Sequence, residues 1–247
     1  VLPLLVGRAT KTLDRLPTHD KSYTATLRFG AISDTLDIWG EVTETGAPIP
    51  TRAAVEAALP AFRGEIMQVP PMTSALKKDG VRLYELARQG IEIDREARPV
   101  TIYQLELLDY DEQEGLLTLH CACSKGTYIR TLCKDLGEAL GCGGCMAALR
   151  RVQAGAYTEE MAVSLETLIS AENPEKYLQN VDTIFLQHPA VTLTAKQALR
   201  CRNGNTFSID LPEGTYRAYD ENGEFLMLAQ VADGVMSTIK SFFLINN

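Results

Sequence analysis

The stretch Ser124-Lys125-Gly126-Thr127-Tyr128-Ile129-Arg130 joins a predicted strand to a predicted helix. The strand is predicted by the β-forming residues that precede it, and the helix over 127–140 by apolar residues that recur every three to four positions. Gly126 lets the backbone approach a ligand closely, and the free amide groups of a helix start can bind an anion. Arg130 lies one turn inside this helix, so its guanidinium should project near the junction. Taken alone, the stretch is equally typical of a helix that carries a surface arginine.

The surrounding sequence predicts an α+β fold, with a mixed, mostly antiparallel sheet that carries helices. Near alternation of apolar and polar residues, with many β-branched side chains, predicts strands. Helical spacing predicts helices over 51–62 and 81–89, and Pro70-Pro71 requires an extended path. The predicted strands cover 21–31, 99–110 and 116–123, and a further strand follows Leu149-Arg150-Arg151.

After Gln187 the sequence changes character. Short β-rich runs alternate there with Asn-Gly, Glu-Gly and Asp-Gly turn signals. These runs predict a small β-rich domain of about sixty residues, which is within the usual size of a small domain.

Composition and charge exclude several classes of protein. The chain has 247 residues, of which 45% are hydrophobic, and no apolar run is long enough to span a membrane. The net charge of −8 argues against a simple nucleic-acid binder. The charge is uneven, however, because residues 99–120 hold five acids and no base, whereas residues 121–155 hold five bases and two acids. An anionic ligand could bind this central segment, and an ordinary solvated surface remains the alternative.

Several ordered motifs together resemble the TruB family of tRNA pseudouridine synthases. They cover about residues 1–157 and are far more specific as an ordered set than singly. The motifs are VLPLLVGRATK at 1–11, DKSY at 20–23, DTLDIWG at 34–40, QVPPMTSALK at 68–77, GVRLYELARQG at 80–90, CSKGTYIRTL at 123–132 and LRR at 149–151.

The resemblance implies a pseudouridine synthase core over residues 1–187 and a PUA-like RNA-binding domain over 188–247. The implied activity is isomerisation of one uridine in the T-arm loop of tRNA, at position 55, after the base is flipped from its stack. The implied partner is tRNA, with no cofactor, no membrane and no obligate protein partner, and the implied location is the cytoplasm.

The resemblance also assigns roles to residues. Tyr23 should lie against the flipped uracil and help to handle protons, and Arg130 should pair with the catalytic aspartate and hold it ionised. Asp37 should contact the base, and Leu149 should pack beneath it. Lys11 and Lys125 should contact phosphates or brace the site. Further phosphate contacts, which supply affinity rather than sequence choice, are implied for Lys77, Arg82, Arg88, Arg150 and Arg151.

The family's nucleophilic aspartate lies in a Gly-(Thr/Ala)-Leu-Asp-Pro motif just upstream of the segment that matches Val1. We therefore expect this sequence to be N-terminally truncated and, as given, to be inactive. Asp14 follows Ala9-Thr10-Lys11, downstream of the motif's place, so we do not expect it to act as a substitute. A tRNA-binding module of the same fold without catalysis is the alternative reading.

A third reading rests on cysteine. Cys142 and Cys145 have the spacing of a zinc or redox half-site, and His120 is the histidine nearest to them in sequence. A lone half-site is weak evidence, so we predict no metal and reduced thiols.

Overall fold

The computed structural model describes residues 1–16 and 20–243, which form two compact units. The first unit contains Val1–Leu2 and the described residues of His19–Met161. The second contains the described residues of Pro3–Thr18 and of Ala162–Asn247. No helix within these described parts of the chain is long and apolar enough to cross a membrane.

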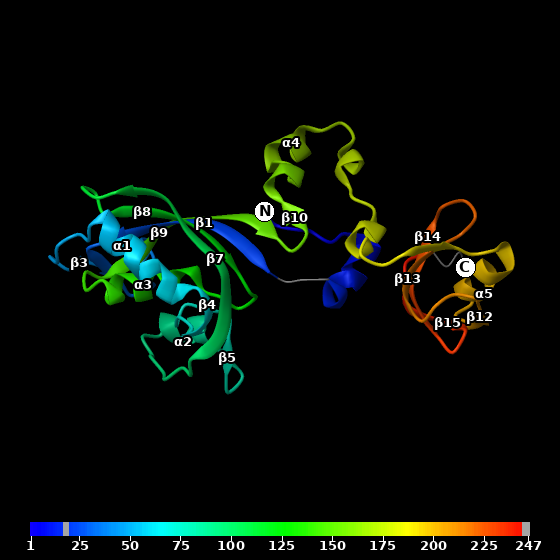
Figure 1. Ribbon diagram of the computed structural model, residues 1–247, viewed down its shortest axis with the longest axis horizontal. Coiled ribbons are helices and arrows are strands. Elements are labelled where there is room, and N and C mark those ends of the chain that lie inside the picture. The colour runs from blue at the N-terminus through cyan, green and yellow to red at the C-terminus, as the bar shows by residue number, and fades with distance from the viewer. Residues whose placement is uncertain (17–19, 244–247) are drawn as a thin grey trace. The chain divides into compact units, whose positions relative to one another are not determined.

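The first unit is built on a six-stranded sheet in which every pairing is antiparallel. Strand β1 lies near the centre of the sheet, between β8 and β9 (Figure 1). The strands, in their order across the sheet, are β10 (Tyr157–Thr158), β9 (Gly144–Ala154), β1 (Lys21–Phe29), β8 (Leu116–Cys123), β7 (Arg98–Asp111) and β4 (Gly64–Gln68). The predicted antiparallel sheet is confirmed, although the strand that contains residues 149–151 begins earlier, at Gly144.

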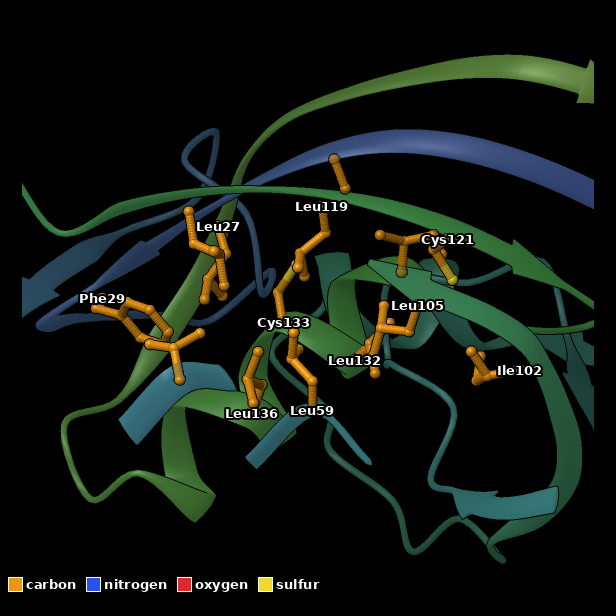
Figure 2. Close-up of a cluster of buried hydrophobic side chains, with 14 of the residues drawn as sticks. Leu27, Phe29, Leu59, Ile102, Leu105, Leu119, Cys121, Leu132, Cys133 and Leu136 are labelled. Carbon is orange, nitrogen blue, oxygen red and sulfur yellow. The ribbon is translucent and has the colours of Figure 1, made fainter. Parts of the chain in front are cut away.

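Alternation along β1 determines which side of the sheet carries the core. Leu27 and Phe29 are buried on the side covered by helix α3 (Ile129–Ala139), whose Leu132 and Leu136 pack into the same cluster (Figure 2). Burial of each such leucine contributes about 1.5–3 kcal/mol. This apolar face therefore fixes α3, and with it Arg130, against the sheet.

A close backbone approach fixes the far end of α3. A Cβ added at Gly137 would lie 2.3 Å from Gly144 N, so no side chain fits between the helix and the start of β9. The carbonyl of Gly137 also accepts hydrogen bonds from Cys142 N and Gly143 N, at 3.1 and 3.0 Å. Helix and strand are consequently joined through backbone atoms.

Smaller elements complete the first unit. Helix α1 begins after Thr51, whose side chain caps Ala54 N as the sequence predicts. The predicted helix over 81–89 is shorter than expected, because Val81–Arg82 pairs as a strand with Lys77–Lys78 before the helix starts. These elements are β2 (Ala31–Ser33), β3 (Val42–Glu44), α1 (Arg52–Ala58), η2 (Leu59–Phe62), β5 (Lys77–Lys78), β6 (Val81–Arg82), α2 (Leu83–Arg88) and η3 (Glu159–Met161).

The second unit carries a five-stranded sheet, which confirms the predicted β-rich C-terminal region. Helix α5 (Ala195–Arg202), which starts at a capping box of Thr194 and Gln197, was not predicted. The strands, in sheet order, are β11 (Ala190–Thr192), β13 (Gly214–Tyr219), β14 (Phe225–Ala232), β15 (Val235–Ser241) and β12 (Phe207–Ser208). Its remaining helices are η1 (Gly7–Arg15), α4 (Leu165–Ser170), η4 (Pro174–Tyr177) and η5 (Val181–Phe185). The boundary at residue 187 between a catalytic core and an RNA-binding domain stays a prediction. The two compact units show how the chain packs and not what each part does.

Candidate active site

Tyr23 lies on the side of β1 that faces the core cluster, toward one end of the strand. It is directly opposite Cys121 on β8 and Arg151 on β9. The ring is half-buried and packs against the edge of the core. Burial raises the pKa of Tyr23, and the nearby Arg151 guanidinium offsets only part of this effect. The phenol is therefore neutral near pH 7.

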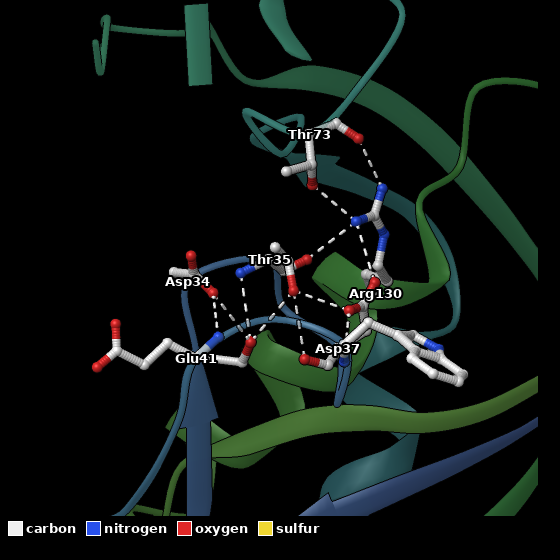
Figure 3. Close-up of polar contacts among 8 residues, drawn as sticks. Asp34, Thr35, Asp37, Glu41, Thr73 and Arg130 are labelled. Atoms are coloured by element: carbon white, nitrogen blue, oxygen red, sulfur yellow. Dashed lines mark hydrogen bonds and ion pairs between the residues drawn. The ribbon is translucent and has the colours of Figure 1, made fainter. Parts of the chain in front are cut away.

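Arg130 lies in the first turn of α3, where four hydrogen bonds hold its guanidinium (Figure 3). Nη1 donates to Thr35 O at 3.0 Å, to Asp37 Oδ2 at 3.2 Å and to Thr73 Oγ1 at 2.7 Å. Nη2 donates to Thr73 O at 2.8 Å. The Nε–H and one of the two Nη2–H groups make no hydrogen bond with any residue among 1–16 and 20–243, so two donors of the group stay open to a ligand. This network fixes the orientation of the guanidinium, whereas an exposed arginine side chain can adopt many orientations.

Asp37 forms the other half of this ionic pair. Its Oδ1 accepts from Thr35 Oγ1 at 2.8 Å and from Trp39 N at 3.1 Å, while Oδ2 faces Arg130. The two side chains are only 13% and 21% exposed. A shielded pair of this kind contributes little net stability, because desolvation offsets the attraction. Its value lies in orienting both groups.

The loop that carries Asp37 is attached to the sheet. Ile38 N donates to Met146 O at 3.0 Å, and Met146 N donates to Leu36 O at 2.9 Å, so the loop pairs with β9. Met146 lies three residues before Leu149 on the same strand. Leu149 is opposite Ala25, shares the Tyr23 side of the sheet and is 42% exposed. The fold thus brings four predicted site residues (Tyr23, Asp37, Arg130 and Leu149) to one side of the sheet.

Residues 68–73 contact the start of α3 and hold its first turn in place. Tyr128, the residue that caps α3, supplies no side-chain hydrogen bond. Instead Gln68, which is 1% exposed, accepts from Tyr128 N at 3.0 Å and donates to Tyr128 O at 3.3 Å. Thr131 Oγ1 donates to Val69 O at 3.4 Å, and Thr73 binds Arg130. A long-range amide therefore fixes the backbone of the N-cap residue and satisfies its N–H, as the N3 side chain does in a capping box.

Sequence reasoning missed these holding residues. Thr35, Gln68 and Thr73 all lie within quoted motifs, but no role was assigned to them. Their partners on α3 are 57 to 95 residues away. A polar amide two residues before paired prolines was the one available signal.

The first residue of the sequence also lies at this site. The main-chain nitrogen of Val1 donates to Arg151 O, and Arg151 Nε donates to Val1 O at 2.6 Å. Arg151 is the cross-strand neighbour of Tyr23. Val1 therefore lies beside the strand that carries Leu149 and next to the neighbour of Tyr23.

Comparison with known families decides where this arrangement belongs. Residues 1–129 match the TruB family pseudouridylate synthase (N terminal domain), and residues 130–183 match the tRNA pseudouridylate synthase B C-terminal domain. This chain belongs to the TruB family.

Relatives of the TruB family align with nearly all of the chain. A tRNA pseudouridine synthase B of Burkholderia lata is 46% identical over 246 residues, which are 96% of this chain and 76% of that protein. The enzyme of the same name from Clostridium perfringens is 41% identical and covers 93% of this chain and 80% of its own length.

Solved structures share the fold. An H/ACA RNP bound to a substrate RNA containing 2'-deoxyuridine superposes with a TM-score of 0.64 at 17% identity, over 97% of this chain and 71% of that one. A Cbf5-Nop10-Gar1 complex gives 0.63 at 19% identity, over 96% and 71%. At this identity the likeness supports the fold alone.

The predicted phosphate-binding cations are spread over the surface of the TruB-family core. Lys77, Arg82, Arg88 and Lys125 are exposed, on the β5–β6 hairpin, on α2 and beside Gly126. Two others already have partners within the protein. Arg150 pairs with Glu159, and Arg151 binds Val1 O. Lys11 belongs to the second unit, where Nζ donates to Ser241 O at 3.3 Å.

A cavity of about 820 Å³ lies behind the Arg130 network. Its wall includes Thr35 and Thr73, two of the residues that hold Arg130, together with Tyr84, Lys134 and Asp135. Burial is the main cause that raises the pKa of Asp135.

The cysteines do not assemble into a ligand set in the part of the chain that the structure describes. All six are buried and free, and no group of three His, Cys, Asp or Glu side chains among those residues could hold a metal ion.

Proposed function

We propose that this protein isomerises uridine to pseudouridine in tRNA, at position 55 of the T-arm loop. The observation that carries the proposal is the fixed Arg130 guanidinium, held beside Asp37 on the side of the sheet that also presents Tyr23 and Leu149. Membership of the TruB family and the 46% identical Burkholderia lata enzyme support it. No cofactor enters the proposed reaction.

Arg130 orients the nucleophile in this proposal. The nucleophile is an aspartate carboxylate, which bonds to C1′ of the ribose as the N1–C1′ bond breaks and uracil leaves. The C5 atom of the uracil then bonds to C1′ as the carboxylate is displaced, and the proton lost from C5 is balanced by one gained at N1. The open Nε–H of Arg130 is a charge-assisted donor for that carboxylate, and such a donor favours the ionised form. Both Nη1–H groups and one Nη2–H are already bound to Thr35, Asp37 and Thr73, so the guanidinium does not need to reorganise.

The nucleophile would reach this donor from the amino side of Val1. Val1 is bonded to Arg151, the neighbour of Tyr23, so a residue joined to it there lies at the Tyr23 end of the sheet. The family motif Gly-(Thr/Ala)-Leu-Asp-Pro belongs immediately upstream of this segment. The proposal therefore assigns catalysis to a carboxylate outside residues 1–247.

Tyr23 and Leu149 form the surfaces against which the flipped base lies. A base that leaves its stack needs apolar or aromatic contacts in compensation. Leu149 offers an exposed apolar side chain, and Tyr23 offers a ring whose raised pKa keeps the hydroxyl protonated and able to donate. Asp37 contacts the polar edge of the uracil in this proposal.

The surrounding cations hold tRNA by its phosphates. Lys77, Arg82, Arg88 and Lys125 are exposed and can reach a phosphate backbone, although Arg82 also donates to Tyr84 Oη at 3.1 Å. Arg150 and Arg151 would have to exchange their present partners. We propose that the protein binds the T-arm stem and loop of tRNA in the cytoplasm, without an obligate protein partner.

The test is an assay of pseudouridine in a tRNA transcript with two proteins. One is the chain as given, and the other is the same chain extended upstream of Val1 by a segment that carries the family motif. We expect both to bind tRNA and only the extended chain to form pseudouridine.

An Asp→Asn change in the added motif is the matched control and should abolish the product. Product from the chain as given would overturn the assignment of the nucleophile. Binding without product by the extended chain would favour a binding module without catalysis.

A further inference from the structure

Trp39, the only tryptophan in the sequence, is exposed next to the Arg130 site. Its side chain is 88% exposed, although indole is among the side chains that gain most from burial. The indole N–H makes no hydrogen bond with any residue that the structure describes. Nothing in the fold of the first unit explains why this position carries a large aromatic ring.

The loop beneath Trp39 is rigid. Leu36 has a φ of 64°, a left-handed conformation that leucine adopts only where its surroundings impose it. A Cβ at Gly40 would lie 2.1 Å from Asp34 Oδ1 and 2.3 Å from Thr35 Oγ1, so the loop closes on itself without free space. Glu41 N donates to Asp34 Oδ1 at 2.8 Å and completes the closure (Figure 3). Trp39 therefore stands on a preformed base.

One carboxylate joins Trp39 to the proposed catalytic group. Asp37 binds Trp39 N through Oδ1 and Arg130 through Oδ2. Two apolar side chains of the same region are also exposed. Ile38, on the same loop, is 40% exposed, and Leu149, on the strand to which the loop is bonded, is 42% exposed. The backbone at Trp39 is thus coupled to the guanidinium through one carboxylate.

The charges around the ring select bases rather than phosphates. Asp34 and Glu41 are exposed carboxylates on the same loop, and they repel a phosphate backbone. Unstacked nucleobases lack this repulsion and stack readily on aromatic side chains. A base-flipping enzyme also leaves the neighbours of the flipped nucleotide without a stacking partner.

We propose that Trp39 is a stacking platform for a nucleobase adjacent to the isomerised uridine. The proposal rests on the proposed function, because it takes the substrate to be RNA with one nucleotide flipped out. Stacking on Trp39 adds binding energy and fixes the position of the RNA strand along the site. The carboxylate of Asp37 links that position to Arg130. The nucleobase next to the target thereby helps to place the target over the site.

The sole tryptophan provides its own reporter. A tRNA transcript is titrated into the chain while indole fluorescence is recorded, and the anisotropy of end-labelled tRNA is followed in parallel. We expect quenching of the indole with the same midpoint as binding.

Substitutions then measure the contribution of the ring. Trp39→Ala should weaken tRNA binding by about 5- to 150-fold, the range for loss of one stacked base, and Trp39→Phe should restore most of it. Leu108→Ala is the matched control, since Leu108 is 54% exposed on β7, and it should leave the Kd unchanged. The unfolding midpoint of Trp39→Ala should equal that of the unchanged chain, because so little of the ring is buried.

Transcripts with single abasic positions in the T-arm loop identify the base. At one position next to the target, loss of the base should abolish quenching of the indole. That abasic transcript should bind the unchanged chain and Trp39→Ala with the same Kd. If tRNA binds without quenching and Trp39→Ala binds equally well, the stacking platform is overturned while the proposed function stands. If tRNA does not bind at all, the proposed function falls and the platform falls with it.

Discussion

Arg130 and the arginines of segment 77–88 present the same functional group in two different settings. Arg130 is 21% exposed and is fixed by four hydrogen bonds to three residues in two loops. Arg82 and Arg88 are exposed and lie over the ring of Tyr84, at 5.8 and 5.3 Å from its centroid. A guanidinium fixed by several hydrogen bonds can orient a reacting group, whereas exposed ones supply attraction to phosphates with little direction. The comparison predicts that substitutions at the first site change turnover and that those at the second change affinity.

Arg130→Lys should produce the largest effect. A lysine ammonium is a point charge on a flexible stem and cannot meet Thr35, Asp37 and Thr73 together. We expect the rate of pseudouridine formation at saturating tRNA to fall about 10²–10³-fold, with the Kd changed less than about threefold. Arg88→Lys is the matched control and should leave the rate intact. An unchanged rate in Arg130→Lys would remove the distinction between the two settings.

Gln68→Leu tests how the fixed setting is maintained. The change is close in volume but leaves the N–H of Tyr128 without its partner, at a cost of about 1–3 kcal/mol, while the C=O keeps its hydrogen bond from Leu132 N. The free energy of unfolding, measured with urea, should fall accordingly. Gln104→Leu changes an exposed glutamine on β7 and should alter it by less than about 0.5 kcal/mol. Equal effects of the two changes would show that Gln68 does not hold α3.

Thr73→Val removes one donor–acceptor pair from Arg130 and keeps the shape of the side chain. A hydrogen bond to a charged group contributes about 1.5–3 kcal/mol, so turnover should fall at least about tenfold. Thr73→Ser restores the hydroxyl and should restore the rate. If the serine variant is as slow as the valine variant, the contact with Arg130 is not the reason for the loss.

Arg88→Ala should have the smallest effect and should appear in binding. Loss of one phosphate contact weakens tRNA binding uniformly and makes the slope of log K against log salt shallower by about one. The rate at saturating tRNA should not change. A lower rate at saturating tRNA would show that Arg88 acts on turnover, as Arg130 does, and not on affinity.

The sequence predicted the main sheet and the central helix because both depend on local periodicity. Alternation along 21–29 and 116–123 and the 3–4 spacing from Ile129 follow from burial of one face, so they can be read without the fold. Motifs in a shared order then predicted Tyr23, Arg130, Asp37 and Leu149, which the fold brings to one side of the sheet.

The remaining features depend on contacts that no local pattern encodes. Gln68 holds Tyr128 across 60 residues, and Thr35 reaches Arg130 across 95. Arg130 was predicted to pair with the nucleophile, and that prediction stays untested. The observed partner of Arg130 is Asp37, which was predicted only to contact the flipped base. Helix α5 was missed because its eight residues are too few to show a clear period.

The most direct measurement maps pseudouridine along a tRNA transcript after incubation with the extended chain. The account predicts a single conversion in the T-arm loop, at position 55, which is about 10²–10³-fold slower when Arg130 is lysine. Conversion of other uridines, or conversion that does not depend on Arg130, would contradict it.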